Sequence, residues 1–367
     1  MTNPPAKTRH RPRSRVVLLL ALVAVAACVL APASAAAKSS AKPKPLYWGA
    51  VIGSQLTGEA APFDFGAVEA FERNARKGIS ILSFSSPFAD CFTICRTFPF
   101  PTLAMETLRE HGTIPFLSWA SQSVPSSLNE PAYTLKAITD GSQDAYIEGF
   151  AEQVQEWGRP FFLRFDAEMN GFWFPWSEGV NGNKPGQFVA AWRHVHDIFT
   201  RVGATNATWV WCPNVDFTGN LTPLEKLYPG NEYVDWTCLD GFNWGNTRNS
   251  AGWQNFNEVF SSTYKRVVKV APNKPMVIGE TAAEERGGSK ANWIKESLKA
   301  IPSKYRKIRA VIWFDEKDQG MHWPIESSKS ATNAFAKAIS PPVYRANTFS
   351  ELPPGPIQPP GPGLAGG

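Results

Sequence analysis

Short, nearly continuous apolar runs alternate with longer amphipathic stretches over most of the 367-residue chain. Apolar runs of this kind are typical of parallel strands that are covered on both faces. Between them, helical spacing of apolar residues predicts helices over 142–158 and 186–203, ending at Gly158 and Gly203 as C-terminal caps. The eight runs begin at Leu46, Ile79, Thr113, Pro160, Thr208, Val234, Pro275 and Ile308.

Eight strand–helix units predict an α/β protein with the fold of a TIM (β/α)8 barrel. A doubly wound sheet is the alternative, but no glycine-rich dinucleotide-binding turn follows the first strand. The barrel would occupy residues 46–340, which leaves no room for a second folded domain. We therefore expect a single catalytic domain.

The two ends of the chain differ in composition from the predicted barrel. Residues 1–37 combine a basic start, an apolar stretch and the small residues "ASAAA", which predicts a cleaved export signal and a secreted protein. The apolar stretch is short for a membrane span. A lipid anchor on Cys28, which ends "VAAC", is an alternative, and an uncleaved anchor is a third. Residues 38–45 are expected to be a linker, and the Pro/Gly-rich residues 341–367 a disordered tail.

The net charge of +5 belongs to the predicted export signal. Without that signal the chain is close to neutral, so nothing indicates a nucleic-acid partner. We expect a monomer with no stable membrane span after cleavage of the signal. The five basic residues of the signal are Lys7, Arg9, Arg11, Arg13 and Arg15.

Four cysteines remain outside the predicted signal, and an even number in an exported protein predicts two disulfides. Of the three possible pairings we favour Cys91–Cys95 as a local clip and Cys212–Cys238 as a link between neighbouring elements. Free buried thiols are the alternative. No metal site is expected, because two histidines at positions 194 and 196 of a helix point in different directions.

Acidic residues recur where the predicted strands end. Glu168 ends the fourth run, Asp240 lies near the end of the sixth, and Glu280 ends the seventh. Catalytic groups of barrel enzymes gather at these carboxyl ends. Strand alternation places Arg164 and Asp166 on the same face as Glu168. Two glutamates on strands 4 and 7 suit glycoside hydrolysis, in which one carboxyl group donates a proton and the other attacks the anomeric carbon.

Aromatic residues follow the first of these glutamates. The loop "FWFPWSEGVNGNKPG" carries Trp173 and Trp176 among turn-forming residues. Indole rings offer flat apolar surface on which a pyranose can stack, and loop packing is the alternative role. Trp173, five residues after Glu168, is the first candidate for sugar binding, followed by Trp313 and Trp244.

These segments resemble glycoside hydrolase family 26, the β-mannanase family. "RFDAEMNGFW" resembles its acid/base signature, Arg-Pro-Leu-His-Glu-Met-Asn-Gly, and "PMVIGET" its nucleophile segment. "WVWCPN" and "YVDWTCLDGFNWG" are similar to its fifth and sixth strands. The resemblance implies a retaining endo-glycosidase without a cofactor, in which Glu168 is the acid/base and Glu280 the nucleophile. It also implies that Trp173 lies near the cleavage point, that Asp240 is the strand-6 acid, and that Trp313 is the platform under the reacting sugar.

Two positions depart from the family pattern. The family usually has His before the acid/base glutamate, where this chain has Ala167, and an aromatic hydroxyl where it has Phe242. Each lost hydrogen bond to a charged group is worth roughly 1.5–3 kcal/mol, so the substrate contacts should differ. We expect a plant- or microbe-derived β-linked polysaccharide, with β-1,4-mannan first and β-1,3-xylan or β-glucan as alternatives. A non-catalytic polysaccharide-binding protein is the contrasting possibility. Further candidates for substrate binding are Arg164, Trp176, Asn243 and Trp244.

Overall fold

The computed structural model describes residues 43–361 apart from 218, 220–221 and 248–251. The expected export signal and the possible anchor at Cys28 lie outside the described residues. Eight parallel strands form one sheet, and pairing of the first strand with the second closes it into a barrel. The strands are β1 (Tyr47–Ile52), β2 (Ile81–Asp90), β4 (Ile114–Val124), β5 (Phe161–Phe165), β6 (Ala207–Trp211), β7 (Trp236–Asn243), β8 (Met276–Ala283) and β9 (Ile308–Asp315).

The closed sheet confirms the predicted TIM barrel and excludes a doubly wound sheet, which is open. All eight apolar runs contain a strand of the barrel. A short strand that the sequence did not indicate, β3 (Arg96–Thr97), pairs antiparallel with the end of β2. It lies outside the barrel wall.

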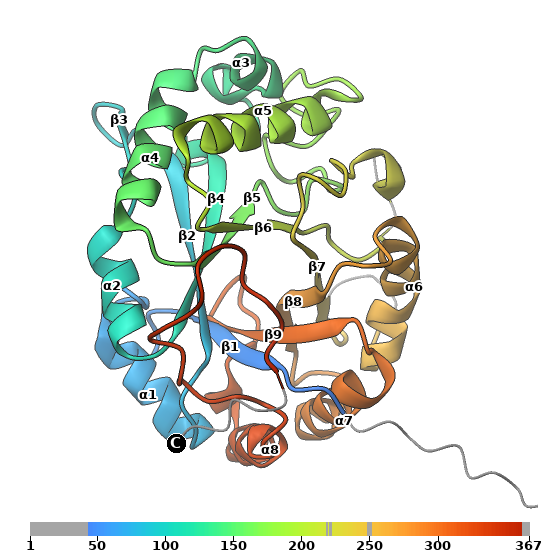
Figure 1. Ribbon diagram of the computed structural model, residues 1–367. Helices are drawn as coiled ribbons and strands as arrows, with labels where there is room; N and C mark the ends of the chain where they lie inside the picture. Colours follow the sequence, from blue (N-terminus) through green and yellow to red (C-terminus); the bar gives the residue numbers. More distant parts are fainter. Residues whose placement is uncertain (1–42, 218, 220–221, 248–251, 362–367) are drawn as a thin grey trace, which may run out of the picture. The chain divides into compact units, whose positions relative to one another are not determined.

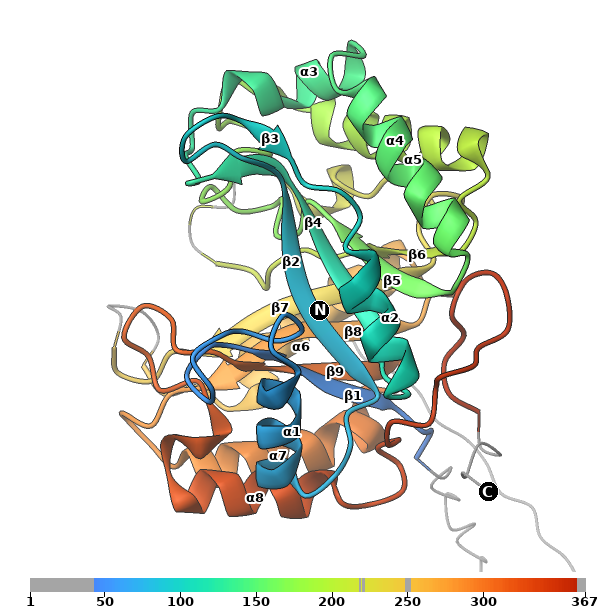
Figure 2. The ribbon, with the colours of Figure 1, turned by 90° about the vertical axis from the view of Figure 1, so that its left-hand side faces the viewer.

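The helices surround the strands, as Figure 1 shows. Figure 2 shows α1, α7 and α8 on one side of the strands and α4 and α5 on the other. The predicted caps are confirmed, since Gly158 and Gly203 adopt φ of 69° and 88° at the ends of two helices. None of the described helices combines the length and apolar character needed to cross a bilayer. The helices are α1 (Phe65–Ala75), α2 (Thr102–Glu110), α3 (Leu135–Thr139), α4 (Asp144–Trp157), α5 (Gln187–Val202), α6 (Phe256–Val270), α7 (Lys290–Lys304) and α8 (Lys329–Ile339).

Strand alternation divides the core in two. One face of each strand packs against the helices, and the other points into the barrel, where it meets the side chains of the other strands. The interior is densely aromatic: Tyr47, Phe162 and Trp236 contact one another across it. The barrel is therefore a packed core at this level and carries no pore.

Residues 341–361, which we call the floor segment, are ordered, so the predicted disordered tail is wrong for this part. The segment covers the end of the barrel at which the strands begin. Phe349 and Ile357 are buried in the barrel interior, 1% and 4% exposed. Tyr47 donates from its hydroxyl to the Gln358 carbonyl at 2.9 Å, and Trp236 donates from its ring nitrogen to the Ile357 carbonyl at 2.7 Å. Buried apolar side chains and hydrogen bonds to the barrel together hold the segment, although its composition resembles that of a linker.

Both favoured disulfides are present. Cys91 is bonded to Cys95 in the loop between β2 and β3, and Cys212, directly after β6, is bonded to Cys238 on β7. The first disulfide lies in an exposed loop and the second is fully buried inside the barrel. The two disulfides thus stabilise different levels of structure, a loop tip and the barrel wall.

Candidate active site

Glu168 lies three residues beyond β5, where the chain turns sharply. Asp166 and Glu168 have φ of 42° and 56°, a left-handed conformation that is costly for residues with a side chain and is concentrated at functional sites. Asn214 donates from its amide to Oε1 of Glu168, and Trp173 donates from its ring nitrogen to Oε2 at 2.6 Å. Both carboxyl oxygens are therefore oriented by the protein.

The pKa of Glu168 suits a proton donor. Burial, and after it the negative charge of Glu280, raise this pKa from the ordinary value of 4.5 to about 7, against the opposing effect of the hydrogen bonds from Asn214 and Trp173. Asp166 also has a pKa raised to about 7 by burial. Asp166 is fully buried and accepts hydrogen bonds from the backbone and hydroxyl groups of Ser121, so it anchors the turn.

Arg164 connects the other predicted acids. Its guanidinium donates to Oε1 of Glu280, to Oδ2 of Asp240 at 2.9 Å, and to the Ser118 hydroxyl at 2.8 Å. Arg164 and Asp240 are buried, whereas the Glu280 side chain keeps 20% of its surface exposed. A planar guanidinium holds two carboxylates in fixed directions. The sequence predicted all three residues, and the structure brings them together.

A disulfide and a glycine shape the wall beneath this network. The ladder between β7 and β8 shifts register next to Gly279, so that Glu280 lies directly opposite Asp240. A Cβ atom on Gly279 would lie 2.5 Å from Sγ of Cys238 and 2.7 Å from Oδ1 of Asp240. The Cys212–Cys238 bond therefore packs against Asp240 only because residue 279 has no side chain.

Metal binding has no support from the donor set within the described part of the chain. The one group there with the spacing of metal ligands is Cys212, Cys238 and Asp240. Its two sulfur atoms are bonded to each other and offer no thiolate. His194 contacts Asp144 while His196 packs on Trp209, so the two histidines diverge as expected.

Aromatic rings lie next to Glu168, as predicted, but from two loops. Trp173 is half-buried and packs against Phe172 and Phe217, with ring centroids 5.3 Å and 4.7 Å away. Phe217 follows β6, and nothing in the sequence motif indicated it. Trp176 is only 3% exposed, because it stacks on Phe174 and donates to the Ala167 carbonyl. The prediction that Trp176 offers a sugar-binding surface is therefore wrong.

The predicted platform on β9 is wrong by one residue. Trp313 is 1% exposed and packs outward against Phe335 of α8, and its ring nitrogen donates to the Trp323 carbonyl. Alternation along β9 instead turns Phe314 toward the interior, where its ring lies 5.5 Å from that of Phe242. An apolar strand covered on both faces carries no polar marker that reveals which ring points inward.

The remaining predicted contacts divide. Trp244 is half-buried beside Phe242 and Trp323, at the same end of the barrel as the glutamates. Asn243 is fully buried, and its side-chain oxygen accepts from the backbone of Gly245 and Gln254. Its predicted role in substrate binding is therefore wrong, since it holds the loop that follows β7.

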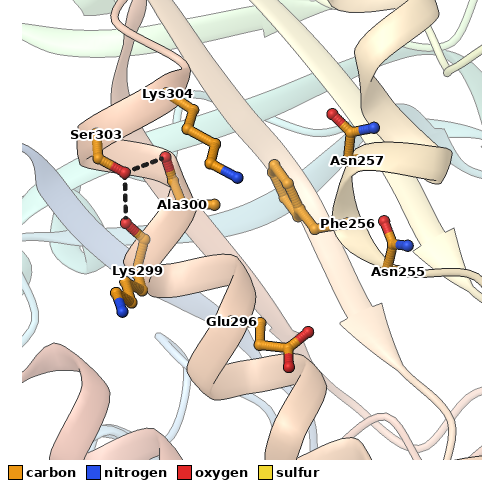
Figure 3. Close-up of a pocket in the computed structure, with 8 residues that line it drawn as sticks. All are labelled: Asn255, Phe256, Asn257, Glu296, Lys299, Ala300, Ser303 and Lys304. Atoms are coloured by element: carbon orange, nitrogen blue, oxygen red, sulfur yellow. Dashed lines mark hydrogen bonds between the residues drawn. The ribbon is translucent and has the colours of Figure 1, made fainter.

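A cavity is also found away from these residues. It has a volume of about 640 Å³ and lies between the start of α6 and α7. Figure 3 shows the residues that line it. Its walls include Phe256 and the charged residues Glu296, Lys299 and Lys304. None of the predicted site residues lines it.

Comparison with known proteins identifies the family of the chain. The model of the family described as "Glycosyl hydrolase family 26" matches residues 115–307. Endoglucanase H of Acetivibrio thermocellus is 39% identical over 240 residues, which is 64% of this chain and 25% of that protein. Beta-1,3-xylanase TXYA of Vibrio sp is 26% identical over 158 residues, 40% of this chain and 28% of that protein. The chain thus spans about a quarter of the length of these curated relatives.

Solved structures share the fold at low sequence identity. A double mutant of the Cellulomonas fimi endo-beta-1,4-mannanase superposes with a TM-score of 0.61 at 18% identity, over 84% of this chain and 74% of that one. The catalytic domain of the Bacillus sp. JAMB-750 endo-beta-1,4-mannanase gives 0.60 at 19% identity, over 83% and 88%. Both likenesses support the barrel.

Proposed function

The chain belongs to glycosyl hydrolase family 26, and from this premise we propose that it is a retaining endo-glycosidase that cuts β-linked glucan by double displacement. The observation that carries the proposal is the pair Glu168 and Glu280, in different environments at one end of the barrel. Glu168 has its pKa raised to about 7 and can carry a proton. Glu280 faces the fixed positive charge of Arg164.

In the proposed reaction Glu280 attacks the anomeric carbon while Glu168 protonates the departing glycosidic oxygen. Glu168 then removes a proton from water, which attacks the anomeric carbon and releases Glu280. Arg164 and Asp240 hold the nucleophile, and Trp173 and Asn214 orient the acid/base carboxyl group. Trp173 and Phe217 give the departing sugar an apolar surface on which to stack.

Sequence similarity favours glucan over mannan. The relative with 39% identity is named an endoglucanase, whereas the mannanases resemble this chain at under 20% identity, where only the fold is informative. Ala167 and Phe242 also replace the His and aromatic hydroxyl of the family signature. Phe242 packs among rings and offers no hydroxyl to Glu280. β-Mannan and β-1,3-xylan remain the alternative substrates, and the hydrolysis assay below includes both.

The test is to incubate the protein with a panel of β-glucans, β-mannans and β-1,3-xylan and to measure the release of new reducing ends. We expect activity on β-glucan, and its loss in Glu168→Ala and Glu280→Ala. Glu225→Ala, an exposed glutamate after β6, should keep full activity. If wild type and all variants bind polysaccharide and none of them hydrolyses it, the enzyme proposal is overturned. NMR of the first product tests retention, since inversion of the anomer would contradict double displacement.

We also propose that the protein is secreted, because two disulfides are typical of oxidising compartments. N-terminal sequencing of the exported protein is the test. A mature start near residue 38 supports the cleaved signal, and a lipid-modified Cys28 supports the anchored alternative. Retention of residues 1–37 would contradict both.

A further inference from the structure

Glu316 is a third carboxyl group at the active end of the barrel. It follows β9 directly, two residues after Phe314, and the alternation that turns Ile312 and Phe314 inward turns Glu316 inward as well. Its neighbour strand in the sheet is β8, which carries Glu280. Glu316 is half-buried, so solvent or a ligand can reach it.

The end of β1 leaves space for this side chain. Gly53 follows β1 and donates from its backbone to the Asp315 carbonyl at 3.0 Å. A Cβ atom on Gly53 would lie 2.5 Å from Cγ and 2.9 Å from Cβ of Glu316. Any other residue at position 53 would displace Glu316 from its position against β1.

Glu316 differs from the neighbouring acids in having no hydrogen-bond donor among the residues that the structure describes. Asp315 accepts hydrogen bonds from the Ile325 backbone and from Gln55, and Glu284 accepts from Arg286 and His322. For Glu316, the described residues supply neither a hydrogen bond nor an ion pair. Burial and the negative charges of Asp318 and Glu280 raise the pKa of Glu316. A half-buried carboxyl group keeps only part of its water, so the hydroxyl groups of a ligand are suitable donors for it.

We propose that Glu316 accepts hydrogen bonds from hydroxyl groups of the sugar whose anomeric carbon reacts with Glu280, and so helps determine which sugar is cut. The inference rests on the proposed function. Sugar hydroxyls are the donors that the site lacks. Because β8 separates β9 from β7, Glu316 lies on the side of Glu280 away from β7 and β5. The proposed proton donor to the leaving group, Glu168, follows β5, so we assign Glu316 to the glycone.

The test compares Glu316→Gln with Asp318→Asn, which removes the same charge two residues away. Asp318 already accepts a hydrogen bond from Gln319 at 2.8 Å, which makes it a matched control. We expect kcat/KM of Glu316→Gln on the preferred polysaccharide to fall roughly 10- to 150-fold, as for loss of one hydrogen bond to a charged group. The loss should appear mainly in KM, and Asp318→Asn should match wild type.

Binding separates a substrate contact from a structural role. In a Glu168→Gln background, calorimetry measures affinity for the tetrasaccharide of the polysaccharide that wild type cuts. Adding Glu316→Gln should weaken binding by the same factor, with an unchanged melting temperature. Unchanged affinity and KM in an active enzyme would overturn the inference and leave the proposed function intact. An inert wild type would instead overturn the proposed function.

Discussion

The two ends of the barrel interior are built from opposite chemistry. At the floor, Phe349 and Ile357 fill the interior with apolar surface, and backbone carbonyls of the floor segment accept from Tyr47 and Trp236. At the mouth, the end at which the strands finish, the buried charges of Arg164 and Asp240 lie near the left-handed turn of Asp166 and Glu168. The mouth also holds Glu316, whose carboxyl group has no donor among the described residues. The floor is arranged for stability, whereas the mouth retains costly groups that only a reaction would use.

Arg164 at the mouth and Arg309 at the floor illustrate this difference, because the same side chain has different partners at the two ends. Arg164 at the mouth is 4% exposed and binds two carboxylates, while Arg309 at the floor donates only to the carbonyls of Pro45 and Pro360. A carbonyl left without its donor at a half-exposed position can be solvated. A buried carboxylate left without its cation cannot.

Replacing these arginines should give the largest effect and the sharpest contrast. Arg164→Leu leaves Asp240 and Glu280 without their cation, so we expect a loss of roughly 3–5 kcal/mol in stability together with loss of activity. Arg309→Leu removes two hydrogen bonds from a guanidinium to neutral carbonyls. Water can replace these bonds at a half-exposed position, so we expect a loss of about 1 kcal/mol each with kcat and KM kept. Urea unfolding and hydrolysis assays measure both. Equal effects of the two changes would remove the distinction between the two ends.

A substitution at the floor should lower the stability of the protein and leave its activity unchanged. Phe349→Ala opens a cavity in the barrel interior, and such changes cost about 3–5 kcal/mol. We expect a lower urea midpoint with kcat and KM unchanged below the unfolding transition. A change in kcat at constant folded fraction would show that the floor segment also positions the mouth.

How far the sequence predicts each end follows from the same contrast. The mouth was predictable where polar residues interrupt apolar runs: Arg164 lies within β5, Glu280 lies within β8, and Glu168 follows β5. Aromatic residues give no such signal. Trp313 was therefore predicted to point into the barrel, whereas it is Phe314 that does so. The floor segment was missed because its two apolar anchors are separated by prolines and glycines, and burial depended on an interior that only the closed barrel creates.

Asp240→Asn should weaken the interaction with Arg164 without creating a cavity. The amide keeps the shape of the side chain but removes one charge from the pair with Arg164, which costs about 1.5–3 kcal/mol when the bond involves charged groups. We expect kcat to fall by roughly 10- to 150-fold, because Arg164 positions Glu280 through this network. Steady-state kinetics measure it. An unchanged kcat would mean that Asp240 serves stability alone.

The smallest effect is a pH dependence that only the mouth should impose. Because the pKa of Glu168 is raised to about 7, the proton donor is lost above that pH, and kcat/KM should fall about tenfold per pH unit. Between pH 4.5 and about 7 folded Glu168 binds its proton more tightly than the unfolded chain does, so stability should decrease as pH rises through this window.

Glu168→Gln removes this titration and leaves that of Asp166, so its melting temperature should decline less steeply than that of wild type as pH rises from about 4 to about 8. Phe349→Ala should shift the whole curve downward with the slope of wild type, because the substitution neither adds nor removes a titrating group. Parallel curves for wild type and Glu168→Gln would show that folding does not raise the pKa of Glu168. The mouth would then lack the electrostatic cost by which it differs from the floor.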